Sequence, residues 1–469
     1  MSTTTTLSTP QARARTGGHG WTLALASVGS FLVVLDLFAV STALPTLRVD
    51  LHANITTLDW IINAYTLTFA VLLMAAAALG DRWGRRAAYL AGLLLFAAAS
   101  AACALAGNGA ELVAARAVQG VGAALIMATA LALINAAFPA ERRGWAMGVY
   151  GAVTGIATTL GPVLGGVITE LLGWSSIFWI NVPIAVVAAV CVALRIRDGR
   201  TRAVADRLDL SGLALGGAAV LVLVWAVIRA ADIGWGDGLV IAALGLGVAL
   251  LAALIVRLRR ARHPLIPLRL FADAQFSSGV VGIFLLTASV TAVVFFTAQF
   301  LQNGQGDGPL AAGLHLLPLG VVPLVLGMRS GAYADRIGTR PMILLGLILQ
   351  GIGITIIAVL GGTGLPYPVL GVAMAITAAG FTCAVPALTK SVVGSVPPAD
   401  IGTASGLFTT VRQVGGAFGV AAASAAFSAS GGYGTPAAVA AGYRAAMIVA
   451  ALAVLIALAA NIRIRKDRS

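Results

Sequence analysis

The chain has 469 residues, of which 59% are hydrophobic and only 10% are charged. A soluble domain carries roughly 25% charged residues, so this composition excludes a soluble enzyme, a disulfide-linked secreted scaffold and a disordered chain. The mean hydropathy of +0.97 indicates a protein whose solvent is a lipid bilayer. The net charge of +13 would suggest nucleic acid in a soluble protein. Basic loops on one side of a membrane explain it here, and we expect no nucleic-acid partner.

The sequence predicts an all-α polytopic membrane protein. A membrane-spanning helix needs about 20 mostly apolar residues, and fourteen runs meet this requirement. We expect these spans at residues 21–44, 59–79, 87–107, 111–137, 145–170, 176–194, 210–231, 237–256, 276–301, 312–333, 341–361, 366–389, 402–427 and 439–461.

The basic residues are distributed unevenly between the two sides of the predicted membrane. If the amino terminus is cytoplasmic, 24 of the 30 Lys and Arg residues fall in loops or tails on the cytoplasmic side, whereas the acidic residues are shared almost evenly. This is the positive-inside pattern, in which acidic residues count for little. An even number of spans then places both tails, 1–20 and 462–469, in the cytoplasm.

The spans divide into two halves with an insertion between them. We expect an amino-terminal six-helix bundle at 21–194, a linker with two additional helices at 195–275, and a carboxy-terminal six-helix bundle at 276–461. The inserted spans 210–231 and 237–256 hold few polar residues away from their ends. We therefore expect this pair to face lipid and to lie outside the transport path.

Asp36, in VVLDLFAVSTALP, is the only acidic residue deep inside a predicted span. It lies about 22 Å along its helix from Trp21, at 1.5 Å per residue. A charge at that depth costs at least about 2.5–3.5 kcal/mol, so the carboxylate should face a cavity or a partner. Such an acid is suited to bind and release a proton. The alternative is a structural carboxylate locked to one arginine.

Arg116, in ARAVQGVGAALIM, is the natural partner of Asp36. A nearby guanidinium keeps a carboxylate ionised, and its withdrawal allows the carboxylate to take up a proton. The two residues therefore predict a proton switch. The alternative is that Arg116 extends to the outer headgroups and leaves Asp36 alone.

Two loop sequences indicate an internal repeat. The first, ALGDRWGRRAAYL, follows the second span, and a weaker copy, GAYADRIGTRPM, occupies the corresponding place in the second half. Its glycines permit a tight turn, and its aspartate can face the end of a neighbouring helix while the arginines hold it. Such repeats are common in secondary transporters. The residues concerned in the first copy are Gly80, Asp81, Arg82, Gly84, Arg85 and Arg86.

Two further spans carry unusual sequences. The fifth reads GIATTLGPVLGG, where small residues allow close packing and proline bends the helix. With 56 glycines in the chain, packing alone is the simpler explanation. The thirteenth contains Arg412 near mid-membrane, with no second deep acid to neutralise it. The small residues and proline of the fifth span are Gly155, Gly161, Pro162, Gly165 and Gly166.

Together these segments resemble the major facilitator superfamily, and within it the fourteen-helix drug:proton antiporters. GDRWGRR is similar to the superfamily's loop signature, and RAVQGVGAA to the signature whose arginine, here Arg116, is tied to proton coupling. GIATTLGPVLGG resembles the antiporter signature of exporters, and LDLFAVSTALP that of the fourteen-helix group, with Asp36 at its acidic position. The resemblance implies two pseudo-symmetric bundles around a cavity that opens alternately to each side.

A substrate cavity near the midplane should be lined by residues that are polar, aromatic or adaptable. Phe and Met suit an adaptable apolar pocket, and each candidate has packing as its alternative role. The candidates are Asn63, Tyr65, Gln119, Met127, Asn181, Phe295, Gln299, Arg412 and Gln413.

The leading functional hypothesis is proton-coupled export of hydrophobic or cationic drug-like molecules. The first alternative is a dedicated exporter of an endogenous metabolite or antibiotic, and the second is a non-transporting membrane receptor or scaffold. We expect no enzymatic activity and no cofactor other than the coupling proton. We also expect no ATP-driven transport, because no GxxxxGK[ST] loop is present. The three cysteines have no metal-ligand spacing. We further expect a monomer in the bacterial plasma membrane.

Overall fold

The computed structural model describes residues 17–196, 209–261, 264, 266–362, 366–397 and 400–462, and its regular structure over these ranges is helical. Most of both predicted cytoplasmic tails and most of the basic loop 195–209 lie outside the described residues. The prediction of an all-α membrane protein is confirmed, because thirteen helices are long and apolar enough to cross a bilayer.

The amino-terminal half is built from six spans, the last of which is broken into two helices. These helices are α1 (Gly17–Asp50), α2 (Ile55–Trp83), α3 (Arg85–Ala104), α4 (Gly109–Ala137), α5 (Ala140–Leu172), α6 (Ser175–Trp179) and α7 (Asn181–Arg195). The inserted pair follows as α8 (Leu210–Ile233) and α9 (Gly238–Arg260).

The carboxy-terminal half repeats this plan, with a break in its second span. Its elements are the short 3-10 helix η1 (Leu268–Ala272), α10 (Ala274–Gln299), the π-helical turn η2 (Phe300–Gly304), α11 (Pro309–His315), α12 (Leu317–Ile337), α13 (Thr339–Leu360), α14 (Tyr367–Gly394), α15 (Ile401–Ser430) and α16 (Pro436–Asn461). Helix α15 is not among the thirteen apolar spans. It is 30 residues long, and Arg412 and Gln413 lower its hydropathy.

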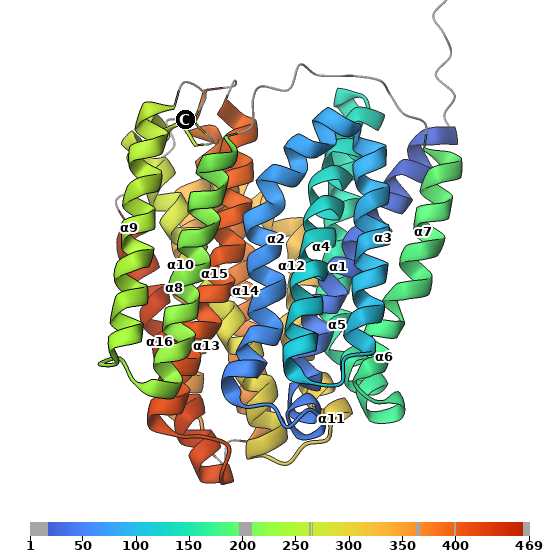
Figure 1. The fold of residues 1–469 in the computed structure, drawn as a ribbon. Helices are drawn as coiled ribbons and strands as arrows, with labels where there is room; N and C mark the ends of the chain where they lie inside the picture. Colours follow the sequence, from blue (N-terminus) through green and yellow to red (C-terminus); the bar gives the residue numbers. More distant parts are fainter. Residues whose placement is uncertain are drawn as a thin grey trace, which may run out of the picture.

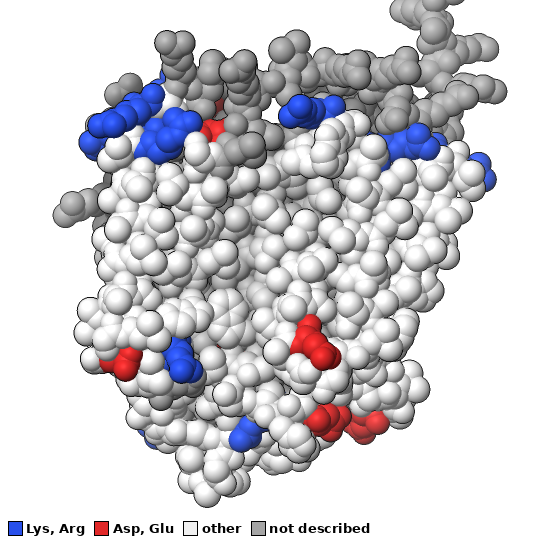
Figure 2. Space-filling model, in the orientation of Figure 1, with Lys and Arg blue, Asp and Glu red and all other residues white. Residues whose placement is uncertain are grey.

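The helices stand side by side in one bundle (Figure 1). Helix α1 begins and α16 ends at the same end of this bundle, which we call the terminal end, and the other end is the opposite end. On the face shown in Figure 2, the basic side chains gather mainly at the terminal end. This agrees with the one-sided distribution expected from the sequence.

The two halves share a turn geometry that supports the predicted repeat. Gly84 joins α2 to α3 and Gly338 joins α12 to α13, and both have φ of 98°. Only glycine adopts such a backbone readily. Two residues further on, Arg86 Nη2 donates to Ala193 O at 2.5 Å, and Arg340 Nη2 donates to Ile462 O at 2.9 Å. In each half, an arginine of the third span thus binds the end of the sixth.

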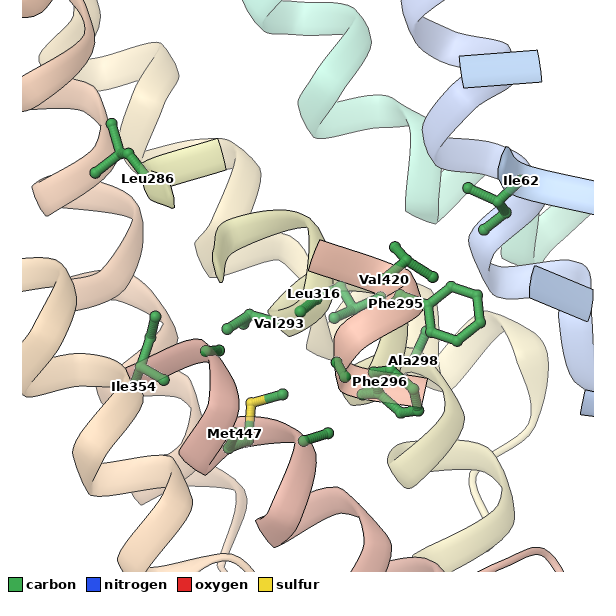
Figure 3. Packing of buried hydrophobic residues seen from close by; sticks show 14 of the residues in the cluster. Ile62, Leu286, Val293, Phe295, Phe296, Ala298, Leu316, Ile354, Val420 and Met447 are labelled. Carbon is green, nitrogen blue, oxygen red and sulfur yellow. The ribbon is translucent and has the colours of Figure 1, made fainter. Parts of the chain in front are cut away.

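The halves are tightly closed against each other at the opposite end. One hydrophobic cluster runs through both, and Figure 3 shows Ile62 of α2 close to Val420 of α15 and Phe295 of α10. Hydrogen bonds add to this contact, since Gln302 Nε2 donates to Thr42 O at 2.9 Å and Leu310 N donates to Glu170 Oε2 at 2.9 Å. Any pathway to the opposite end requires these contacts to separate.

The inserted helices do not lie equally far from the bundle. Helix α9 packs on α8 and is largely exposed. Helix α8 covers the seam between α2 and α15, where Leu67 packs with Val224, Ile228, Ala417 and Ala421. Of the pair expected to face lipid, α9 is largely exposed, whereas one side of α8 packs against both halves, where the small side chains of α15 leave room for it.

Candidate functional site

Asp36 lies on α1 inside the amino-terminal half and forms a buried ion pair with Arg116 of α4. Arg116 Nη1 contacts Asp36 Oδ2, and both side chains are fully buried. The predicted neighbours are therefore in contact in this structure. A buried ion pair is stable only where further hydrogen bonds satisfy the remaining polar atoms.

The second oxygen of Asp36 accepts two amide hydrogen bonds. Gln119 Nε2 donates to Oδ1 at 3.0 Å, and Asn181 Nδ2 donates to the same atom at 2.9 Å. The first of these amides is further positioned by Ser100 Oγ, which accepts from Gln119 Nε2 at 2.9 Å. Both oxygens of Asp36 thus accept hydrogen bonds from buried donors.

Arg116 is held on three sides besides that of Asp36. Its Nε donates to Ile61 O at 3.1 Å, and its Nη1 donates to Gln119 Oε1 at 2.6 Å. Its guanidinium carbon lies 4.1 Å from the centre of the Tyr65 ring, a cation–π arrangement. With no exposed surface, Arg116 does not extend to the headgroups in this state.

An apolar cavity lies between the two halves, next to this ion pair. Its volume is about 260 Å³, and eight long helices contribute residues to it, four from each half. The lining residues are Val33, Val34, Leu37, Phe38, Tyr65, Phe69, Met127, Thr154, Gly155, Thr158, Pro162, Thr287, Val290, Thr291, Val294, Leu316, Leu319, Gly320, Pro323, Ala378, Phe381, Arg412 and Gln413.

Tyr65 connects the cavity to the ion pair. Its ring lies against Arg116, and the residue is part of the cavity lining. Its hydroxyl donates to Val33 O at 3.0 Å, and Val33 is itself a lining residue one turn before Asp36 on α1. Tyr65 thus joins the cavity lining to the buried carboxylate site.

The nine predicted cavity residues occupy three different places. Tyr65, Met127, Arg412 and Gln413 line the cavity. Gln119 and Asn181 bind Asp36 instead. The remaining three are Asn63, Phe295 and Gln299, all buried but outside this cavity's lining.

Helix rotation explains why Phe295 and Gln299 do not line the cavity. Thr287, Val290, Thr291 and Val294 form the lining stripe of α10, and Phe295 is rotated by about 100° from Val294. Phe295 consequently packs in the cluster that closes the opposite end. Asn63 lies on α2, one turn after Asp59. Its side-chain amide is buried and has no hydrogen-bond partner among the described residues.

The small residues of α5 allow close packing against α1 and against the other half. A Cβ on Gly161 would lie 2.6 Å from Phe38 Cβ, and one on Gly165 would lie 2.5 Å from Ala39 O, both on α1. A Cβ on Gly166 would lie 2.4 Å from Pro309 O across the halves. Gly155 and Pro162 line the cavity. This sequence therefore joins α5 both to the Asp36 helix and to the other half.

The loop after α2 fixes the terminal ends of three helices. Gly80 lies against Thr129 of α4, and Arg85 Nη1 donates to Ala132 O of the same helix at 3.1 Å. Arg86 reaches α7, as described above, and Arg82 is exposed. The side chain of Asp81, predicted to face a neighbouring helix end, lies outside the described part of the structure.

Asp59 is a second buried carboxylate, which the sequence analysis did not single out. It lies in the first turns of α2 with no exposed surface, and Ser424 Oγ of α15 donates to its Oδ1 at 2.6 Å. A position near the start of a helix suggests a solvent-exposed side chain, and the sequence gives no sign that α15 packs against Asp59. Ser100 was also missed, although it is a lone polar residue in the apolar run of α3.

The sequence has clear relatives. Residues 26–420 match the profile of the Major Facilitator Superfamily. The chain is 34% identical over 412 residues to the tetracenomycin C resistance and export protein of Streptomyces glaucescens, covering 86% of this chain and 75% of that protein. It is 35% identical over 437 residues to the cephamycin export protein CmcT of Amycolatopsis lactamdurans, covering 91% and 88%. It is 33% identical over 401 residues to the multidrug resistance protein Stp of Mycobacterium tuberculosis, covering 85% and 74%.

The fold is also similar to a solved structure. A POT family transporter in complex with 5-aminolevulinic acid superposes with a TM-score of 0.69, covering 93% of this chain and 94% of that one. At 14% identity this similarity concerns the fold alone. The bacterial relatives and the many apolar helices identify a multi-pass protein of the bacterial plasma membrane. The chain belongs to the Major Facilitator Superfamily and is a membrane transporter rather than an enzyme.

Proposed function

We propose that this protein is a proton-coupled antiporter that exports apolar, drug-like small molecules by alternating access. The observation that carries the proposal is the buried Asp36–Arg116 pair beside an apolar cavity that both halves line. The carboxylate is the group that takes up and releases the proton, and no other cofactor is required. We propose that a single chain suffices for transport, because one chain builds the whole cavity.

The proposed direction, export, is supported by the relatives that are named as export proteins, and the proposed orientation agrees with it. The basic residues favour a cytoplasmic terminal end, with both termini inside. The hydrophobic cluster and the hydrogen bond from Gln302 to Thr42 close the opposite end. In this state the cavity would therefore take substrate from the cytoplasmic side or from the inner leaflet, as an exporter must.

Coupling would arise from competition for Asp36. While Arg116 and the amides of Gln119 and Asn181 bind the carboxylate, its ionised form is stabilised. Movement of α1 relative to α4 would remove the guanidinium, and the isolated carboxylate would then be favoured in its protonated form. Proton uptake and helix movement would thus be linked. Substrate enters this linkage through Tyr65, which contacts both the cavity and Arg116.

The second candidate, a dedicated exporter of one metabolite or antibiotic, has the same mechanism with narrower specificity. Two relatives support it, because they are named as export proteins for tetracenomycin C and for cephamycin. A third is named as a multidrug resistance protein and supports the broader function. The cavity's apolar lining fits both.

An efflux assay in cells tests the proposal and separates the two candidates. Cells expressing the wild-type protein should retain less of several unrelated apolar compounds, and a protonophore should abolish the difference. Protection against only one chemical family would favour the dedicated exporter. Efflux that persists after collapse of the proton gradient would overturn the proposed coupling.

A further inference from the structure

The cavity is electrically unbalanced. Its 23 lining residues include Arg412 but neither Asp nor Glu. The carboxylate of Asp36 does not line the cavity. It is fully buried and is bound by Arg116, Gln119 and Asn181. The charge presented to a molecule in the cavity is therefore positive.

Arg412 has no anionic partner within the described part of the chain. None of the described residues forms an ion pair with its guanidinium or accepts a hydrogen bond from it. A charged side chain at membrane depth is costly unless something compensates it. An arginine that faces a cavity without a protein partner leaves five N–H donors available to a ligand.

Two other polar groups of the lining are also available as donors. Thr287 Oγ1 of α10 is buried without a described hydrogen-bond partner, and the amide of Gln413 adjoins Arg412 on α15. Thr287 and Thr291 of α10 face α15 one turn after Arg412. A Cβ placed on Gly416 would lie 3.7 Å from Thr287 Cγ2 and 3.1 Å from Thr291 Oγ1. These donors belong to two facing helices of the carboxy-terminal half.

We propose that Arg412, with the hydroxyl of Thr287 and the amide of Gln413, binds an anionic or strongly hydrogen-bond-accepting group of the substrate. This inference rests on the proposed function and specifies its substrate class. The preferred substrates are amphiphilic, with an apolar body and one carboxylate, phenolate or comparable oxygen-rich group. Arginine recognises such groups because its planar fork donates two parallel hydrogen bonds.

The remainder of the lining matches the other end of such a molecule. Valine, leucine, phenylalanine and Met127 line the parts contributed by α1, α2 and α4. An apolar body placed there would reach Tyr65 and hence the Asp36 site, while its anionic group bound Arg412. The two halves would accordingly bind different ends of one substrate, which ties its presence to their relative position.

Matched ligands test this assignment. Three compounds with one apolar aromatic scaffold would carry a carboxylate, a carboxamide or a primary amine, and their dissociation constants would be measured on the purified full-length protein in phosphatidylcholine nanodiscs. We expect the carboxylate to bind at least tenfold more tightly than the carboxamide, and the amine to bind most weakly. Arg412→Gln should remove the difference between carboxylate and carboxamide, whereas Arg412→Lys should retain part of it.

Arg444→Gln is the matched control, because Arg444 is an exposed arginine of α16 outside the cavity lining. This control should leave all three affinities unchanged. Equal wild-type affinities for the three compounds would overturn the inference, as would a carboxylate preference that survives in Arg412→Gln. If Arg412→Gln does not fold, Thr287→Val provides the second variant and should reduce the preference several-fold.

Two further measurements, export of the compounds and competition by an anionic lipid, separate this inference from the proposed function and from lipid binding. If the carboxamide is exported in a proton-dependent manner but the carboxylate has no advantage, only the substrate class is wrong. If neither compound is exported, the proposed function fails. Repeating the measurement with phosphatidylglycerol in the nanodiscs tests whether a lipid phosphate binds Arg412. Competition from that lipid would weaken carboxylate binding in the wild type and not in Arg412→Gln.

Discussion

Tyr65 lies between Arg116 and the cavity: its ring centre is 4.1 Å from the guanidinium carbon, and the same residue is part of the cavity lining. The proposed coupling site and the proposed binding site therefore share one aromatic side chain. A change in the position of this ring on substrate binding would alter the contacts of Arg116 directly. The proposed coupling therefore requires no long chain of intermediate residues.

The first prediction concerns this shared ring. Tyr65→Phe keeps the cation–π contact and loses only the hydrogen bond to Val33 O, whereas Tyr65→Leu removes the aromatic face, a contact of about 0.5–2 kcal/mol. We expect Tyr65→Phe to retain proton-coupled transport and Tyr65→Leu to transport with a lower ratio of protons to substrate. Flux ratios in proteoliposomes measure this. Equal ratios in both variants would show that the ring does not link the two sites.

The second prediction concerns closure at the opposite end. A Cβ on Gly166 would lie 2.4 Å from Pro309 O, so Gly166→Val should prevent the halves from closing there. We expect at least a tenfold loss of transport, with substrate binding reduced much less. Gly245→Val is the control, since a Cβ at Gly245 of α9 meets nothing within 4 Å. Normal turnover in Gly166→Val would contradict the role of this contact.

The third prediction distinguishes the two inserted helices. Val224 of α8 is buried against α2 and α15, whereas Val248 of α9 is 62% exposed. Packing contacts stabilise helix association in membranes, so Val224→Ala should lower the melting temperature by a few degrees. Val248→Ala should leave it unchanged. The same melting temperature in both variants would show that α8 contributes no more to stability than α9.

The fourth prediction follows from the proposed substrate charge. Export of a monoanion in exchange for one proton moves one more charge per cycle than export of its neutral analogue. Each charge gains about 2.3 kcal/mol per 100 mV, which is about 50-fold in a concentration ratio. At an inside-negative potential of 100 mV, the carboxylate compound should therefore reach a limiting gradient about 50-fold steeper than the carboxamide. Identical limiting gradients in proteoliposomes would rule out transport of the anion.

Residues that stand out chemically within an apolar span were predictable from the sequence. Asp36 and Arg116 are charges in runs where charges are costly, and their pairing follows from that cost. The spacing of Gln119, three residues after Arg116, also places both on one helix face. That spacing could have assigned Gln119 to the ion pair rather than to the cavity.

Contacts that depend on helices distant in the sequence were not predictable. Asn181 reaches Asp36 because the sixth span breaks at Ile180 and α7 begins at Asn181. Asp59 is buried because Ser424, 365 residues away, lies against it. Phe295 packs in the hydrophobic cluster rather than in the cavity lining, and hydropathy does not report which face of a wholly apolar helix points to a cavity.

The central claim is that Asp36 carries the coupled proton, and proton flux in proteoliposomes tests it most directly. Substrate release down its gradient should drive measurable proton movement in the wild type, as reported by a trapped pH-sensitive dye. Asp36→Asn should abolish this movement while the protein still folds and binds substrate, and Asp237→Asn, which alters a half-buried aspartate that caps the start of α9, should leave it intact. Substrate-dependent proton movement that persists in Asp36→Asn would place the coupling site elsewhere and contradict this account.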